Sequence, residues 1–148
     1  MNYNLKDVEQ FLQQRQFIDT AIVPLLPVDF STEGALRFSS DAEFLMSLVT
    51  YIEKQFRGRI FMAPPFPYFQ NKDKIDIIDI KGNLKEQGFQ HVLFVTTDLS
   101  WDIKKLGNEI LLLPAIPVQS MDQDVKSRIF QDQLNYVLPK LTSLWTSK

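Results

Sequence analysis

The chain has 148 residues, the length of one domain, and its hydrophobic (45%) and charged (23%) fractions are those of an ordinary globular protein. A net charge of −2, with no basic cluster longer than a dipeptide, argues against a nucleic-acid partner, and the absence of cysteine excludes thiol nucleophiles, cysteine-ligated metals and disulfides. No apolar run approaches the roughly 18 residues of a membrane span. The N-terminal segment is polar. We therefore expect a cytoplasmic protein that forms a single domain over residues 1–148.

Four segments have the apolar spacing of amphipathic helices. They are residues 4–16, 39–56, 75–88 and 120–145. Ser39 or Ser40 is expected to cap the second helix, and Ser120 with Gln123 resembles a capping box for the last. Pro139 is expected to kink or break the last helix near its end. The third segment also alternates like a strand in "IDIIDIKG", so a strand is the alternative there.

Four short apolar runs lie between these helices and predict strands. They read "TAIVPLL", "RIFMAPP", "HVLFVTT" and "EILLLPAIPV". We expect "FPYFQNKDK" to be a loop and "DLSWDIKKLG" to be a connector with a short helical turn. Apolar strands that alternate with helices predict an α/β fold, with three layers (α/β/α) built around a four-stranded, mainly parallel sheet.

In a parallel α/β sheet, ligands bind outside the carboxyl ends of the strands. The stretches that follow the predicted strands hold six of the eight prolines, which stiffen loops and suit a preformed pocket. We predict a ligand pocket at this edge, lined by Asp29, Glu33, Tyr68, Thr97, Asp98 and Trp101. The structural alternative is that the prolines only end strands and the acidic residues stabilise helix starts and turns.

The sequence lacks the residues that several kinds of catalytic and binding site require. The five glycines form neither GxGxxG nor a P-loop, and His91, the single histidine, opens the third strand, opposite the predicted pocket. A Ser-His-Asp triad and a zinc centre are therefore not expected, and we predict no catalytic residue and no cofactor. The remaining catalytic hypothesis is a Mn²⁺ or Mg²⁺ site formed by Glu33, Asp41 and Asp98.

The order of elements over roughly residues 19–100 resembles the first part of the creatininase family of metal amidohydrolases. The stretches that carry the resemblance are "DTAIVPLLPVDFSTEGALRFSSDAEF", "GRIFMAPPFPYF" and "LKEQGFQHVLFVTTD". The resemblance pairs Glu33 and Asp41 with two metal ligands of that family, but their separation is shorter and no histidine lies between them. "TTDLSW" replaces the histidine-bearing loop of the family. The resemblance implies a creatininase-like core whose metal site is lost.

As a whole, the chain is more similar to the YpiF-like proteins, an uncharacterised family of Bacillus-type bacteria. The similarity lies in the length, the "DVEQFL" start, the "DTAIVPL" strand and the "PPFPYF" turn, and it implies no established activity. We predict a non-catalytic binding or interaction protein that takes a small ligand, a protein partner or a second copy of itself. The alternatives are the Mn/Mg hydrolase and a structural subunit docking through its C-terminal helix, where Trp145 is a candidate anchor.

Overall fold

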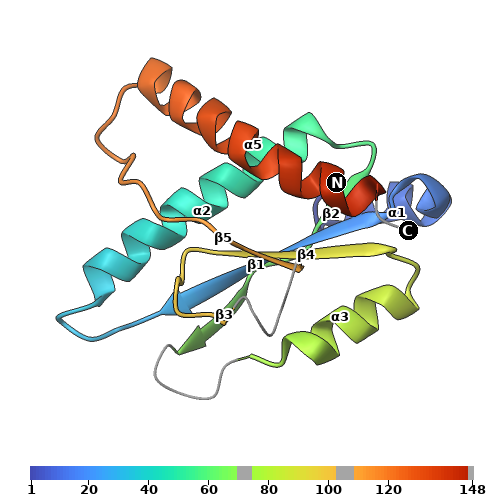
Figure 1. The fold of residues 1–148 in the computed structure, drawn as a ribbon, viewed down its shortest axis with the longest axis horizontal. Helices are drawn as coiled ribbons and strands as arrows, with labels where there is room; N and C mark the ends of the chain where they lie inside the picture. The colour runs from blue at the N-terminus through green and yellow to red at the C-terminus, as the bar shows by residue number, and fades with distance from the viewer. Residues whose placement is uncertain (70–74, 103–108, 147–148) are drawn as a thin grey trace.

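The protein is a three-layer α/β structure, and its computed structural model describes residues 1–69, 75–102 and 109–146 (Figure 1). The strands of the described part form one sheet, and all their pairings are parallel: β1 (Thr20–Val28), β2 (Ile60–Met62), β3 (Phe66–Phe69), β4 (His91–Thr96) and β5 (Ile110–Leu112). The main helices are α1 (Leu5–Gln13), α2 (Ala35–Gln55), α3 (Ile77–Glu86) and α5 (Gln123–Thr146), and a short 3-10 turn, η1 (Arg15–Phe17), follows α1. This arrangement confirms the predicted fold class.

Strand β1 lies at the centre of the sheet. It pairs with β4 along one side, from Thr20 opposite His91 to Leu25 opposite Thr96. On its other side its first residues pair with β2 and its last four, Leu25–Val28, pair with β3, so β2 and β3 lie end to end. Strand β5 extends the sheet beyond β4, which gives the order β2-β1-β4-β5.

Successive side chains of β1 face opposite layers, as the pleat of a strand requires. Ile22 packs in a core formed with α2 and α5, whereas Ala21 and Val23 pack in a second core with α1 and α3. Figure 1 shows α2 and α5 on one side of the sheet and α3 on the other. Helices therefore lie on both faces, which explains why the strands read as continuous apolar runs.

Two strand predictions are corrected. Residues 66–74 were expected to be a loop, but Phe66–Phe69 form β3, because β1 is longer than β2 and its last residues pair with this stretch. The sheet is thus four positions wide but contains five strands. The predicted strand at 109–118 is limited to Ile110–Leu112, since prolines follow at 114 and 117 and cannot donate to a ladder. Residues 70–74 of the predicted loop and 103–107 of the connector lie outside the described part.

The predicted helix caps were also wrong. Helix α2 begins at Ala35, one turn before Ser39, because the loop ahead of it supplies its own hydrogen bond from the Gly34 amide to Ser31 Oγ (3.1 Å). For α5, Asp122 Oδ1 accepts the Val125 amide at 3.0 Å, so Asp122 occupies the capping position predicted for Ser120. The predicted helix at 75–88 is confirmed as α3, and Gly88 follows it with a φ of 104°.

Helix α5 runs through Pro139 to Thr146 instead of ending near the proline. Its last turns are held by tertiary contacts: Leu141 is fully buried, and Trp145 Nε1 donates to Thr20 Oγ1 at 2.7 Å. The Arg59 guanidinium also lies 4.0 Å from the centre of the Trp145 ring. Trp145 therefore packs against its own chain. No helix in the described ranges has the length and apolarity needed to cross a membrane.

A buried ion pair connects α2 to the N-terminal segment. The Met1 ammonium lies 2.9 Å from Glu53 Oε2, and both side chains are at least 96% buried. The ammonium also donates to the Ile60 carbonyl at 2.7 Å, while Arg57 approaches Glu53 Oε1 at 2.8 Å. Burial alone would raise the pKa of the Glu53 carboxyl, but hydrogen bonds and charge from the ammonium and Arg57 outweigh it and lower that pKa.

We expect Glu53→Gln to lower the free energy of unfolding at pH 7 by about 3 kcal/mol, because removing one partner leaves a buried charge uncompensated. The pKa of Glu53 is lower in the folded than in the unfolded protein. Its contribution is therefore present above the unfolded pKa of about 4.3 and is lost as pH falls through the folded pKa. Urea denaturation across this range should show the variant and the wild type converging at low pH.

Glu43→Gln is the matched control, because Glu43 is an exposed glutamate of the same helix. We expect it to change the free energy of unfolding by less than about 0.5 kcal/mol. A loss for Glu53→Gln that matches the control would contradict the stabilising role of the ion pair.

Candidate functional site

A polar hollow lies at the carboxyl ends of the strands, the edge at which a ligand pocket was predicted. This carboxyl-end pocket has a volume of about 460 Å³. Pro27 at the end of β1 and Arg37 and Asp41 on the first turns of α2 form part of its lining. The segment after β4 contributes Thr97 and Asp98.

Three of the predicted site residues form one hydrogen-bonded cluster. The Tyr68 hydroxyl donates to Asp98 Oδ2 at 2.6 Å, and Trp101 Nε1 donates to the same hydroxyl at 2.9 Å. The two rings meet edge to face with centroids 5.7 Å apart. All three side chains are at most 9% exposed, so the cluster joins β3 to the loop after β4 in the protein interior.

The Asp98 carboxylate is occupied by this cluster. Its second oxygen, Oδ1, accepts the Ser100 amide at 3.0 Å and the Ser100 hydroxyl at 2.6 Å. Burial raises the pKa of the Tyr68 phenol, and its hydrogen bond to Asp98 raises it further, so the phenol stays protonated and keeps donating. Tyr68 and Trp101 therefore position Asp98 and the loop, while Asp98 forms one wall of the pocket.

Thr97 differs from its neighbours because its hydroxyl has no hydrogen-bond partner in the part of the chain that the structure describes. The residue is 8% exposed, it lines the pocket, and its Oγ1 makes no hydrogen bond within the described residues. An unsatisfied buried hydroxyl costs roughly 1–3 kcal/mol, so such groups are uncommon in folded proteins. The carboxyl-end pocket thus contains a polar atom placed to accept or donate a hydrogen bond to an incoming molecule.

Opposite charges stand one helical turn apart on the α2 wall of the pocket. Arg37 and Asp41 have the i, i+4 spacing, yet no ion pair in the described part of the chain holds Arg37. Burial raises the pKa of the Asp41 carboxyl, and the charge of Arg37 opposes this shift. A partly desolvated carboxylate and a guanidinium without an ion pair among the described residues therefore line the same pocket.

Asp29 and Glu33 lie apart from this group. Asp29 Oδ1 accepts the Ser31 amide at 2.8 Å, which forms a turn between β1 and α2, and this bond lowers the pKa of the Asp29 carboxyl. A Cβ on Gly34 would lie 2.0 Å from Asp29 Oδ2, so a larger residue at 34 would displace the Asp29 carboxylate from this position. Glu33 is exposed on the same loop and does not line the carboxyl-end pocket.

The carboxylate metal site proposed from the sequence is not assembled. Asp41 and Asp98 line one pocket, but Glu33 does not join them. Across residues 1–69, 75–102 and 109–146, no three His, Cys, Asp or Glu side chains are grouped as metal ligands. His91 opens β4 at the opposite end of the strand, as predicted.

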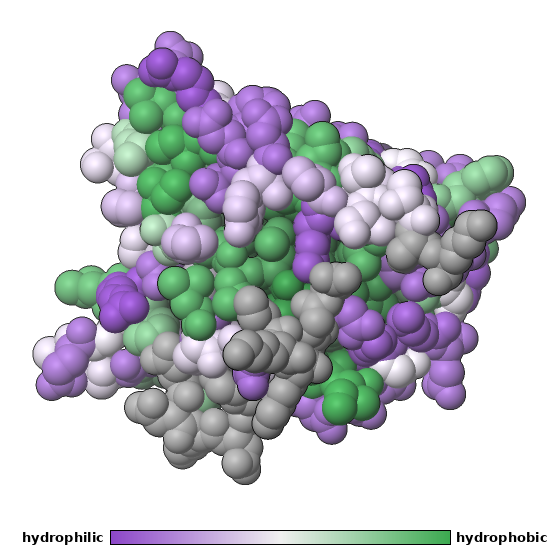
Figure 2. Space-filling view, viewed as in Figure 1, coloured by the Kyte–Doolittle hydropathy of each residue, from purple (hydrophilic) through white to green (hydrophobic). Residues whose placement is uncertain are grey.

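Exposed apolar side chains lie at the same edge of the sheet, on the segments that follow β1 and β4, at the start of α2 and at the end of β3. This apolar rim consists of Phe30, Leu36, Phe69 and Leu99, each at least 52% exposed. The rings of Phe30 and Phe69 lie 6.4 Å apart, which connects the loop after β1 to the end of β3. Figure 2 shows apolar and polar surface side by side at the left of the view, where β1 ends and α2 begins.

Arg37 and Ser100 are pocket residues that the sequence reasoning missed. Arg37 was missed because α2 was expected to start after Ser39, which left residue 37 in a loop. A helix start at Ala35 would have placed Arg37 and Asp41 on one face, so the i, i+4 pair was the available signal. Asp98 and Ser100 have the i, i+2 spacing of an Asx turn, so the structural alternative that acidic residues stabilise turns was the available signal for this bond.

We expect Tyr68→Phe to lower the free energy of unfolding by about 2 kcal/mol, because Asp98 loses a buried donor and the Trp101 indole loses its acceptor. Urea denaturation measures this loss. Tyr136→Phe is the control, since Tyr136 is 58% exposed on α5. Equal stability of the two variants would show that the phenol does not hold Asp98.

Comparisons with known proteins support the resemblance to the uncharacterised YpiF-like family. The model of the family described as "Protein of unknown function (DUF2487)" matches residues 9–145. The chain is 25% identical over 150 residues to the uncharacterized protein YpiF of Bacillus subtilis (strain 168), and the match covers 99% of each chain. No solved structure matches, so the creatininase resemblance gains no support. Since the family model spans almost the whole chain, the chain belongs to the DUF2487 family.

Proposed function

We propose that this DUF2487 protein is a non-catalytic binding protein whose carboxyl-end pocket takes a small polar molecule. The buried Thr97 hydroxyl, which has no hydrogen-bond partner among the described residues, is the observation that carries the proposal, because a ligand that supplies a hydrogen bond would compensate its desolvation. The pocket also lies where ligands bind in open α/β sheets. Neither the family description nor that of the relative names a reaction.

The charges of the pocket favour a small zwitterion of the amino-acid class. Arg37 suits a carboxylate, and Asp41 suits an ammonium group, because each lacks an ion-pair partner in the described part of the protein. Thr97 is available for a third polar contact. In this proposal, Asp98 shapes the pocket, Tyr68 and Trp101 support it, and Asp29 and Glu33 serve the β1–α2 turn instead of the ligand.

A protein partner is the second candidate, and the apolar rim favours it. Phe30 and Leu36 are 81% and 85% exposed, and Phe69 and Leu99 continue the same edge. Clustered exposed apolar side chains with polar neighbours are typical of interaction sites. Docking through α5 has less support, since Trp145 packs against Thr20 and Arg59 of its own chain.

Two finer assignments remain proposals. A creatininase-like core with a lost metal site is compatible with the parallel sheet and with the separation of Glu33 from Asp41 and Asp98. We also propose a cytoplasmic location, which the cysteine-free composition supports. An experimental structure tests the first assignment, and localisation of the native protein by fractionation tests the second.

We expect Thr97→Val to raise the free energy of unfolding of the unliganded protein by about 1 kcal/mol. Valine nearly matches threonine in shape and removes the unsatisfied hydroxyl. Thermal and urea denaturation measure the change, and Thr50→Val is the control, because the Thr50 hydroxyl is exposed and already donates to the Met46 carbonyl. A destabilised Thr97→Val protein would show that the hydroxyl is satisfied in solution.

The ligand class is tested by melting the protein with free amino acids, simple monoamines and simple monocarboxylates. A molecule that binds only the folded state adds roughly 2.7 kcal/mol at about 100 times its Kd. We expect amino acids to raise the melting temperature more than either singly charged class, and Thr97→Val and Asp41→Asn to reduce this shift. No shift from any of the three classes, or a shift that both variants retain, would refute the zwitterion assignment.

A further inference from the structure

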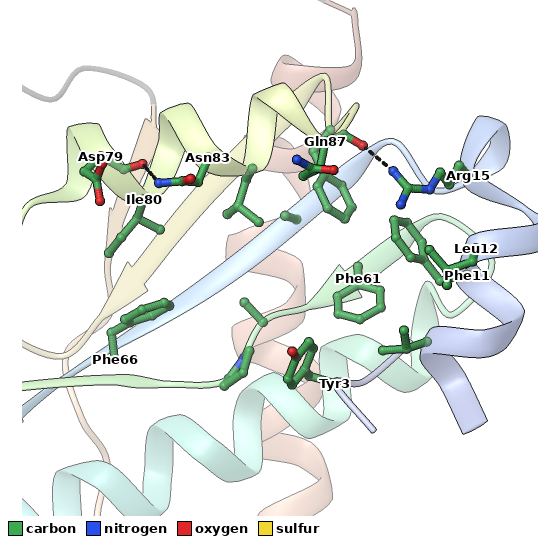
Figure 3. Close-up of a pocket in the computed structure, with 16 residues that line it drawn as sticks. Tyr3, Phe11, Leu12, Arg15, Phe61, Phe66, Asp79, Ile80, Asn83 and Gln87 are labelled. Atoms are coloured by element: carbon green, nitrogen blue, oxygen red, sulfur yellow. Dashed lines mark hydrogen bonds between the residues drawn. The ribbon is translucent and has the colours of Figure 1, made fainter. Parts of the chain in front are cut away.

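A second hollow lies between α1 and α3, on the face of the sheet opposite to α2 and α5 (Figure 3). This α1–α3 trough has a volume of about 460 Å³, within the range of roughly 300–1,000 Å³ that is usual for small-molecule sites. It is closed at one end by two contacts. Arg15 Nη1 donates to the Gln87 carbonyl at 3.0 Å, and the Phe11 and Phe89 rings stack 5.3 Å apart.

The trough is hollow because its floor carries small side chains between large ones. Ala21 of β1 and Ala63 after β2 belong to the part of the lining that the sheet provides, which we call the floor, and Phe61 and Phe66 line the trough as well. Ala21, Ala63 and Phe61 are at most 8% exposed, so the floor is screened from water. A helix, about 10–12 Å across with its side chains, would insert only side chains here. An unbranched apolar chain fits the trough better.

Charge gives the trough a direction. Arg15 is the one cationic side chain in its lining, and no ion pair in the described residues occupies the guanidinium. Asp79 lies at the other end, so the two charges mark opposite ends of the trough in Figure 3. Of the five donor N–H groups of an arginine, the Gln87 carbonyl takes one. An anionic head group is therefore favoured beside Arg15 and repelled near Asp79.

We infer that the α1–α3 trough binds an amphiphile with an unbranched apolar chain and a carboxylate head, the chemistry of a medium-chain fatty acid. The chain lies over Ala21 and Ala63 between the phenylalanine rings. The carboxylate pairs with Arg15 at the closed end. This site is separate from the carboxyl-end pocket and does not depend on the function proposed for that pocket.

The test is isothermal titration of the full chain with octanoate, decanoate, decanol and decyltrimethylammonium below their micelle concentrations. We expect decanoate to bind about 16-fold more tightly than octanoate, because each buried methylene contributes roughly fourfold. Decanoate should also bind more tightly than decanol, and decyltrimethylammonium should bind least. Equal binding of all three ten-carbon probes, or no binding by any, would overturn the inference.

Two variants separate head-group recognition from chain burial. Arg15→Gln should abolish the preference for decanoate over decanol while leaving decanol binding unchanged, and Arg128→Gln, an exposed arginine of α5, is the control. Ala63→Leu should weaken all the probes by filling the floor, provided its melting temperature shows that it folds. Thr97→Val should leave decanoate binding unchanged, which distinguishes the two pockets.

A designed amphipathic helical peptide provides the competing outcome. If this peptide binds and decanoate does not displace it, the trough is a docking groove for a protein helix and the inference fails. If decanoate binds and the peptide does not, or if decanoate displaces the peptide, the inference is supported.

Discussion

The sheet depends on β1, because every strand pairing except the one between β4 and β5 uses it. Its nine residues present one edge to β4 and the other to β2 and β3 in turn. Their side chains enter both cores, with Ile22 on one face and Ala21 and Val23 on the other. A shift of one residue in register would exchange the two cores, so the alternation of this strand specifies the arrangement of all three layers.

The length of β1 also creates the site. Because β1 extends past β2, its last residues require a further partner, and β3 provides it. Tyr68 is thereby carried to the carboxyl edge, where it meets Asp98. This hydrogen bond joins β3 to the loop after β4, next to Thr97, which lines the pocket. The polar pocket is therefore a product of strand geometry as much as of the residues that line it.

The sequence predicted the layers and the edge, and its failures have physical causes. Parallel strands follow from apolar runs separated by helical periodicity, and "PPFPYF" reads as a loop because proline-rich stretches are usually turns. Phe66–Phe69 form a strand because β1 extends beyond β2 and its last residues pair with them, and this depends on tertiary structure that the local sequence does not show. The start of α2 was missed because Ser31 and Gly34 hold the preceding turn, whereas two adjacent serines looked like better caps. Thr97 and Asp98 directly follow β4, so the sequence could place them at the pocket edge. No local pattern could show that Glu33 would lie outside the pocket.

The contact between Trp145 and Thr20 also bears on how the chain folds. It joins residues 125 positions apart, and it seals the start of the central strand with the last turn of the final helix. Contacts of such high sequence separation form late, because a long loop must close before they contribute. During synthesis on a ribosome, α2 is available early to cover its face of the sheet, but the part that α5 covers stays exposed until α5 has emerged. A nascent chain with an exposed apolar sheet face is the kind of species that chaperones retain.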